Sequence, residues 1–159
     1  MITKLLKSSP QINILIVGRN ISNVVLELKD FLHQCNGTLD ICLYEDDANI
    51  KQDTPINKIF YPKDYDSFCN NTSREYEYAI VHDMLDIHSN PAKLLKNLYR
   101  SLENSAQIII LQKHNLKKSS QTQELLEDCE FRAANTITSI YQDYDAIIAK
   151  KLHMWGNGL

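Results

Sequence analysis

The sequence has 159 residues, of which 43% are hydrophobic and 23% charged, and its formal net charge is -3 at pH 7. This length fits one domain around one core. The charge gives no strongly basic field, so it argues against a nucleic-acid partner. No apolar run approaches the ~20 residues of a membrane span, and residues 1–10 do not form a signal peptide. We therefore expect a cytoplasmic protein with no membrane partner.

The cysteines are widely spaced and include no C-x-x-C pair. Their spacing fits neither a zinc clip nor a thiol-exchange motif. The sequence therefore predicts reduced, mostly buried thiols at all of these positions, Cys35, Cys42, Cys69 and Cys129.

The first half of the chain starts with a short β-branched run at residues 12–17 (INILIV), which predicts a strand covered on both faces. Residues 21–35 then place apolar side chains at intervals of three and four, which predicts an amphipathic helix. Asn36 and Gly37 supply a helix stop.

Further apolar runs predict strands at residues 39–44 and 58–61. The segment between them, residues 48–55, is short and polar and predicts no clear crossover helix. A fourth strand is predicted at residues 78–82, followed by a loop. Asn90-Pro91 then opens a helix, because an N-cap residue precedes a proline of the first turn.

The last part of the chain begins with a predicted strand at residues 106–111. Ser120 and Gln123 form a capping box for a helix that ends at Cys129. Residues 131–141 and 144–150 are β-rich runs too close together for a crossover helix, so they predict an antiparallel hairpin.

These elements predict an α/β fold: a doubly wound, mostly parallel seven-stranded sheet with an antiparallel C-terminal hairpin strand and helices on both faces. The domain is predicted to span residues 11–151. Residues 1–10 form an N-terminal extension, and residues 152–159 form a C-terminal tail.

Residues 77–112 (EYAIVHDMLDIHSNPAKLLKNLYRSLENSAQIIILQ) resemble a segment of the class I S-adenosylmethionine (SAM) dependent methyltransferases. The similarity covers their fourth strand, the loop after it, an N-P capped helix and the fifth strand. Residues 126–151, with the pattern YD-x-x-x-A-K, resemble the family's last helix and closing hairpin. Together with the first strand, the resemblance extends over residues 13–151.

The resemblance implies a SAM site where the strands of an open α/β sheet end. Gly18 stands at the turn that passes under the methionine part of the cofactor, and Asn20 and Ser22 stand where the family has further glycines. Asn20 tolerates a left-handed backbone. The Arg19 guanidinium suits the cofactor's carboxylate, yet it repels the sulfonium if it points inward.

Two acids are candidates for the nucleoside end of the cofactor. Glu45 ends the second strand, where a carboxylate accepts both ribose hydroxyls, although the run Glu45-Asp46-Asp47 is equally a solvated acidic turn. Asp64 follows the third strand, where the family often sets an acid against the adenine amino group. Its charged neighbours make a surface loop the alternative.

His82, Asp83 and Met84 follow the fourth strand, and the resemblance places them beside the methionine and the transferred methyl group. Asp83 or His82 is then the candidate base for an acceptor that arrives protonated. The alternative is an ordinary strand end. Methyl transfer requires no metal, because the donor is already activated.

The sequence supports two functions. The first is SAM-dependent methyl transfer to a small-molecule or protein acceptor. The second is a non-catalytic module that binds a protein or self-associates as a homodimer, suggested by the altered glycine loop and by Trp155 in the tail. A metal-dependent hydrolase built on His82, Asp86 and His88 is disfavoured, because their spacing matches no metal motif.

Overall fold

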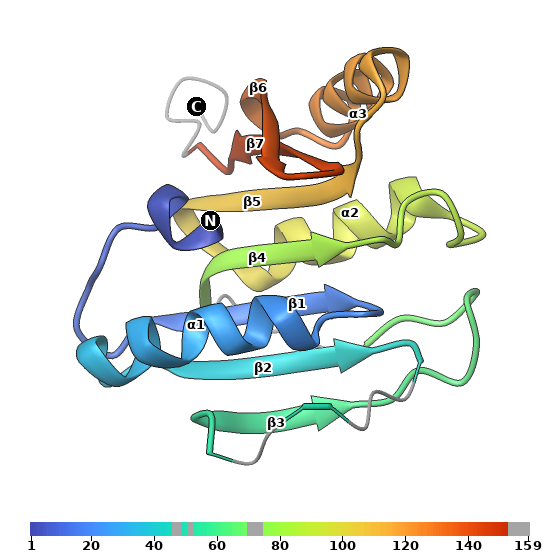
Figure 1. The fold of residues 1–159 in the computed structure, drawn as a ribbon. Helices are drawn as coiled ribbons and strands as arrows, with labels where there is room; N and C mark the ends of the chain where they lie inside the picture. The colour runs from blue at the N-terminus through green and yellow to red at the C-terminus, as the bar shows by residue number, and fades with distance from the viewer. Residues whose placement is uncertain (46–48, 51–52, 70–74, 153–159) are drawn as a thin grey trace, which may run out of the picture.

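The computed structural model describes residues 1–45, 49–50, 53–69 and 75–152. In this part of the chain a seven-stranded sheet has the order β3-β2-β1-β4-β5-β7-β6 (Figure 1). The strands are β1 (Asn13–Gly18), β2 (Thr38–Leu43), β3 (Ile56–Phe60), β4 (Tyr76–His82), β5 (Leu102–Lys113), β6 (Arg132–Tyr141) and β7 (Tyr144–Lys150). The helices are the 3-10 turn η1 (Ile2–Leu5), α1 (Ser22–Cys35), α2 (Pro91–Ser101) and α3 (Leu116–Asp128).

The strands from β3 to β5 are parallel to one another. The next strand, β7, runs antiparallel to β5, and β6 runs antiparallel to β7. Gly18 at the end of β1 is opposite Leu43 of β2 and His82 of β4. Three strands therefore end at the same level, and the segments that follow them lie at one edge of the sheet.

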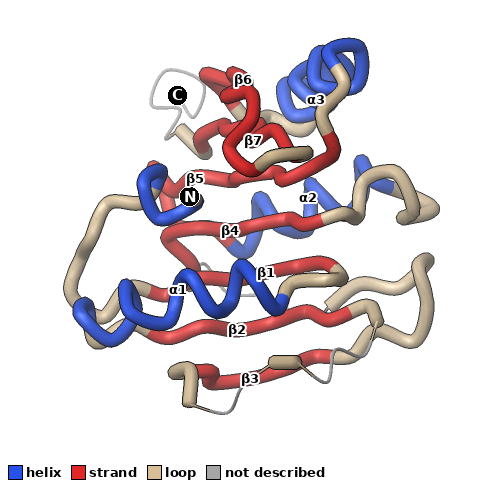
Figure 2. The backbone as a smooth tube through the Cα atoms, in the orientation of Figure 1, coloured by secondary structure: helices blue, strands red, loops and turns tan. Residues whose placement is uncertain are grey.

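Helices cover both faces of the sheet, as predicted (Figure 2). On one face, η1 and α1 bury an apolar stripe against the sheet; the stripe of α1 is Val24, Val25, Leu28 and Leu32. On the other face, α2 and the C-terminal part of α3 pack on a second cluster, with α2 contributing Leu94, Leu95 and Leu98. Each face of the sheet thus has its own core. None of the helices in the described ranges is long and apolar enough to cross a membrane.

The predicted signals at two helix ends are confirmed. Asn36 follows α1 with a left-handed φ of 51°. Asn90 precedes α2, and its side-chain oxygen accepts the Lys93 backbone N–H at 3.1 Å while Pro91 occupies the first turn. Both ends satisfy backbone groups that a helix leaves unpaired.

The start of α3 was predicted wrongly. The N-cap is Asn115, whose side-chain oxygen accepts the Lys118 N–H at 3.0 Å, so Ser120 lies inside the helix. An Asn three residues before a backbone N–H offers the same cap as a serine, and it begins the helix earlier. The strand β5 is also longer than predicted, because Leu102 pairs with Tyr76 and Lys113 pairs with Tyr144.

The prediction of reduced thiols is wrong for two of the cysteines. Cys42 of β2 and Cys69, which follows β3, form a disulfide with their Cα atoms 6.2 Å apart. They are separated by 27 positions in the sequence, and only the return of the chain after β3 brings them together. Cys35 and Cys129 are free, as predicted.

Gly18 is required by the sheet itself. A Cβ at this position would lie 2.1 Å from the carbonyl oxygen of His82, and the residue has a positive φ of 156°. The Arg19 N–H donates to the same carbonyl at 3.3 Å. A side chain at Gly18 would therefore separate β1 from β4 just where both strands end.

We predict that Gly18→Ala lowers the free energy of unfolding by about 2 kcal/mol or more, because the new methyl group meets backbone. Urea denaturation followed by circular dichroism measures the change. Asn20→Gly is the matched control: Asn20 has a left-handed φ of 54°, so a glycine there should leave stability unchanged or raise it slightly. Equal stability of Gly18→Ala and the wild type would contradict the close-packing argument.

Candidate functional site

The candidate site lies at the carboxyl ends of β1 and β4. After β1 the chain continues to β2, which pairs with one edge of β1, whereas β4 pairs with the other edge. This reversal of strand order is where open α/β sheets bind ligands. Arg19 and Asp83 are the first residues after these two strands, so they flank the point of reversal.

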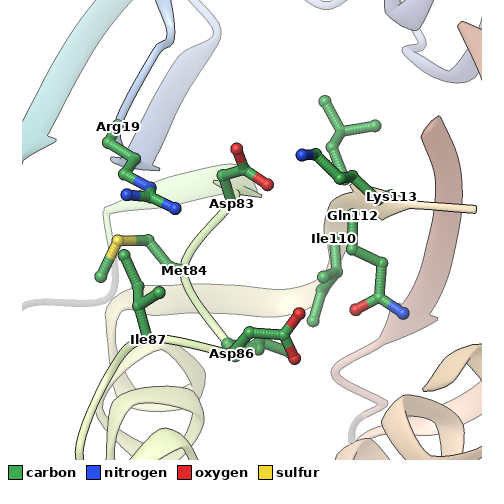
Figure 3. A pocket seen from close by; sticks show the side chains of 10 residues that line it. Arg19, Asp83, Met84, Asp86, Ile87, Ile110, Gln112 and Lys113 are labelled. Carbon is green, nitrogen blue, oxygen red and sulfur yellow. The ribbon is translucent and has the colours of Figure 1, made fainter. Parts of the chain in front are cut away.

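A cavity of about 140 Å³ opens beside these residues (Figure 3). Arg19 lies on one side of it, Asp83 and Met84 come from the loop after β4, and Gln112 and Lys113 come from the end of β5. The volume admits a small polar group and several water molecules. Since both cationic and anionic side chains line it, the cavity suits a polar ligand.

An ion pair connects the cavity to the end of β2. Arg19 Nη1 donates to Glu45 Oε1 at 3.3 Å, and the Tyr65 hydroxyl donates to the same carboxylate oxygen. The hydrogen bond from Tyr65, followed by that from Arg19, lowers the pKa of the Glu45 carboxyl group. Glu45 is therefore ionised at neutral pH. The Arg19 and Glu45 side chains are 30% and 46% exposed, so this pair contributes little to stability.

Arg19 keeps one hydrogen-bond donor free. Its Nε is buried and has no partner among the described residues. Its backbone carbonyl accepts a hydrogen bond from His82 Nδ1 at 2.8 Å, so the main chain is held in place. A buried donor without a partner points to a water molecule or a ligand atom beside it.

His82 is held away from the cavity. Its side chain is buried, and its ring stacks on Tyr144 with 5.2 Å between the ring centroids. Burial lowers the pKa of His82, the Arg19 charge adds to the effect, and the hydrogen bond to the Arg19 carbonyl opposes it. At neutral pH the imidazole is therefore uncharged and donates its Nδ1 proton to the Arg19 carbonyl.

Asp83 is the better placed of the two base candidates. It lines the cavity, and its carboxylate accepts the Tyr144 hydroxyl at 3.0 Å. Burial, followed by the Asp83 charge, raises the pKa of Tyr144 to about 12, so the phenol keeps its proton as a donor. Asp83 also has a left-handed φ of 56°.

The other predicted residues divide between the cavity and the surface. Met84 is buried and lines the cavity. Asn20 is exposed, so it does not fill the hollow. Asp64 is also exposed, and its Oδ1 accepts the Asp66 N–H at 2.9 Å and the Ser67 hydroxyl at 2.8 Å. The hydrogen bond from Ser67 is the main cause of the lowered pKa of Asp64. Asp64 thus closes a turn of its own loop.

Some residues of the predictions lie outside the described part of the chain: Asp46 and Asp47 of the acidic run, and residues 153–159 of the tail, which include Trp155. The proposed metal set is not assembled in the part of the chain that the structure describes, where no group of three metal-ligating side chains occurs. His88 Nε2 donates to the Ser67 carbonyl at 3.1 Å, and its Nδ1 accepts the Asn90 N–H at 2.9 Å. Asp86 pairs with Lys118 at 2.8 Å.

Sequence reasoning missed three features of the site. Tyr65 contacts Glu45 from a loop that carries no motif, so no pattern pointed to it. Tyr144 was recognised only as a strand residue, although its hydroxyl contacts Asp83. Gln112 lines the cavity with a buried Nε2 that has no partner among the described residues.

The buried His82 predicts a dependence of stability on pH. Because its pKa is lower in the folded chain than in the unfolded chain, the folded state binds this proton less readily. The contribution of His82 to the free energy of unfolding is therefore present above the unfolded pKa of about 6.5. It is lost as the pH falls through the pKa of the folded state. Between about pH 7.5 and about pH 5, the melting temperature should fall less for His82→Gln than for the wild type. The exposed His33 provides the control, since His33→Gln should behave as the wild type.

Comparisons with known proteins identify the fold. No family model and no curated protein matches the sequence. Among solved structures, a SAM-dependent methyltransferase from Aquifex aeolicus has a TM-score of 0.68 at 11% identity, over 95% of this chain and 88% of that one. PigF, solved with SAH, has a TM-score of 0.69 at 13% identity, over 95% and 53% of the two chains.

Phosphoethanolamine N-methyltransferase 2 of Haemonchus contortus, in complex with SAM, has a TM-score of 0.69 at 9% identity, over 96% of this chain and 51% of that one. The chain therefore spans about half the length of PigF and of the Haemonchus enzyme, and most of the Aquifex protein. The shared arrangement includes the parallel strands and the antiparallel C-terminal strands. The chain has the class I SAM-dependent methyltransferase fold.

Proposed function

We propose that the chain binds SAM at the ends of β1, β2 and β4, and that it transfers the methyl group to a small-molecule or protein acceptor beside Asp83. The observation that carries this proposal is the meeting of three features at the reversal of strand order: the Glu45 carboxylate, the unused donor of Arg19 and the cavity beside Asp83. Proteins of the same fold have been solved with SAM and with SAH.

The Glu45 carboxylate suits the ribose. It is ionised, partly exposed, and located directly beyond the end of β2. Arg19 and Tyr65 occupy it in this structure, so two ribose hydroxyls would have to displace them. Exposed contacts of this kind contribute on the order of 1 kcal/mol or less each, so their displacement costs little compared with a micromolar affinity of about 8 kcal/mol.

Arg19 suits the carboxylate of the methionine part. Its buried Nε–H lacks a partner among the described residues, and a carboxylate oxygen would supply one. Its positive charge would disfavour a sulfonium at close range. The guanidinium must therefore contact the carboxylate end, which leaves the sulfonium methyl group on the side of Asp83.

SAM supplies an activated methyl group, so the chain's part is to align the acceptor with it and to remove a proton where the acceptor carries one. Asp83 lines the cavity and is held by the Tyr144 hydroxyl, so its carboxylate is positioned to accept that proton. Met84, Ile87 and Ile110 give the cavity an apolar side that limits the access of water.

Calorimetric titration tests the binding proposal. SAM and SAH should both bind in the micromolar range, and Glu45→Gln should weaken both by roughly tenfold to a hundredfold, because hydrogen bonds to a charged carboxylate are lost. Glu124→Gln on the exposed surface of α3 is the matched control and should bind as the wild type. Unchanged affinity in Glu45→Gln would refute the ribose role of this residue.

Two ligands separate the role of Arg19 from that of Glu45. SAH carries the amino-acid carboxylate, whereas 5′-methylthioadenosine has the same nucleoside without it. We expect Arg19→Gln to weaken the binding of SAH by about tenfold, because one hydrogen bond between charged groups is lost. The affinity for methylthioadenosine should stay the same or rise slightly in this variant, because Glu45 is released from its ion pair. An equal loss for both ligands would mean that Arg19 does not recognise the carboxylate.

The alternative is a non-catalytic module that binds a protein or forms a homodimer. One observation favours it: Arg19 and Tyr65 already occupy the carboxylate meant for the ribose. If neither SAM nor SAH produced heat at millimolar concentration, this alternative would replace the methyltransferase proposal, and sedimentation analysis would then test self-association.

A further inference from the structure

We propose that Cys42 and Cys69 form a reversible thiol–disulfide site that exchanges with small disulfides of the glutathione class. In the oxidised state, the bond holds Tyr65 on Glu45 and weakens the binding of a nucleoside there. The consequence for affinity rests on the proposed function, whereas the exchange and the movement of the loop do not.

The bond joins the end of one strand to the loop after another. Cys42 belongs to β2 and is 1% exposed, whereas Cys69 is partly exposed. Only Leu43 and Tyr44 separate Cys42 from Glu45 in the sequence. The disulfide therefore fastens the loop directly beside the candidate ribose acid.

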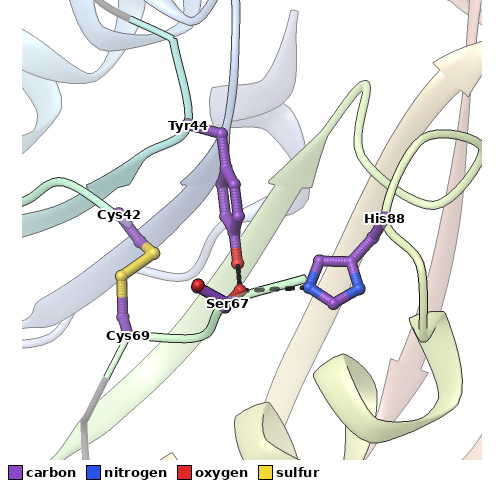
Figure 4. The surroundings of a disulfide bond; sticks show 5 residues. All are labelled: Cys42, Tyr44, Ser67, Cys69 and His88. Carbon is purple, nitrogen blue, oxygen red and sulfur yellow. Dashed lines mark hydrogen bonds between the residues drawn. A yellow bond between two sulfur atoms is a disulfide. The ribbon is translucent and has the colours of Figure 1, made fainter. Parts of the chain in front are cut away.

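The loop between β3 and Cys69 has two kinds of attachment (Figure 4). At Ser67, its carbonyl accepts the Tyr44 hydroxyl at 2.7 Å and His88 Nε2 at 3.1 Å. Phe68 packs against His88, with 4.8 Å between the ring centroids. These contacts are noncovalent, and the disulfide adds a covalent attachment beside them at Cys69.

Tyr65 is held by a backbone hydrogen bond, from the Ser89 N–H to its carbonyl at 3.1 Å, and by weaker contacts of its side chain. Its ring stacks parallel to Tyr44 at 5.9 Å, and its hydroxyl donates to Glu45, which is exposed. Exposed contacts of this kind are readily exchanged for water. Opening of the disulfide would remove the covalent attachment of this loop to β2 and leave noncovalent contacts, so the Tyr65 hydroxyl would leave the carboxylate more often.

The exchange balances with glutathione disulfide as the oxidant. The partly exposed Cys69 thiolate attacks one sulfur of glutathione disulfide, which forms a mixed disulfide and releases one glutathione thiolate. The Cys42 sulfur then attacks Cys69, which forms the protein disulfide and releases the second glutathione. Two electrons pass from the protein to glutathione, and the two thiol protons go to the released thiolates. Reduced glutathione reverses both steps.

The other cysteines serve as internal controls. Cys35 and Cys129 are free. Burial is the main cause of the raised pKa of the Cys129 thiol, so little thiolate is present at neutral pH. The structure offers no pairing of Cys35 or Cys129 with another cysteine, so neither should take part in the exchange.

Thiol counting by alkylation and mass spectrometry tests the exchange. The wild type is equilibrated in a series of glutathione buffers, from fully reduced to fully oxidised. Two alkylated thiols should disappear together as the buffer becomes more oxidising, and both should map to Cys42 and Cys69. Cys35→Ser should retain this transition, and Cys69→Ser should lack it. Four alkylated thiols in the fully oxidised buffer would overturn the proposal.

Hydrogen exchange tests the movement of the loop without any ligand. The Ser89 amide, which donates to the Tyr65 carbonyl at 3.1 Å, should exchange at least severalfold faster in the reduced wild type than in the oxidised wild type. In Cys69→Ser the rates should be the same in both buffers. Equal rates in the two states of the wild type would overturn the proposal, whether or not SAM binds.

Calorimetry with SAH tests the consequence for the site. The reduced wild type should bind about fivefold more tightly than the oxidised form, because the ribose no longer competes with a tethered Tyr65 hydroxyl. Tyr65→Phe should remove the difference by raising the affinity of the oxidised form. Equal or weaker binding by the reduced form overturns the inference about affinity. Absence of SAH binding in both states instead refutes the proposed function and leaves hydrogen exchange to decide the loop proposal.

Discussion

The contact between the ends of β1 and β4 is the constraint on which the candidate site depends. Gly18 has no side chain, so the His82 carbonyl can approach its Cα and accept the Arg19 N–H at 3.3 Å. His82 returns a second bond, from Nδ1 to the Arg19 carbonyl at 2.8 Å. These two bonds place Arg19 and Asp83 on either side of the strand reversal. The glycine that the resemblance assigns to the approach of a cofactor is needed here for the approach between two strands.

Arg19 pairs with Glu45 and lines the same cavity as Asp83, and these two carboxylates have different surroundings. Glu45 is exposed and receives hydrogen bonds from Arg19 and Tyr65, so its contacts are easily exchanged for those of a ligand. Asp83 is partly buried, has a left-handed backbone, and is held by Tyr144. The easily exchanged acid therefore suits recognition, whereas the constrained acid suits a step that needs fixed geometry. This difference follows from burial, and residue type alone does not reveal it.

Most of the sheet was predictable, because apolar β-branched runs and amphipathic spacing are local signals. Asn36 and Asn90 also act at the positions where the chain predicts them. The start of α3 was missed because Asn115 and Ser120 are both acceptable caps, and only the backbone decides between them. The disulfide and the contact of Tyr65 with Glu45 join residues that are 27 and 20 positions apart, so no local pattern reports them.

Two of the missed contacts, the disulfide and the Tyr65 hydrogen bond, hold the loop after β3 near Glu45. From Tyr61 to Cys69 this loop contains no helix or strand. Buried side chains hold this loop at Ser67 and Phe68, and a covalent bond holds it at Cys69. Tyr65 lies between these attachments and β3, and its carbonyl accepts the Ser89 N–H at 3.1 Å. Because Tyr65, Phe68 and Cys69 pack against the core that α2 covers, this loop links the contacts of Glu45 to that core and leaves the core under α1 untouched.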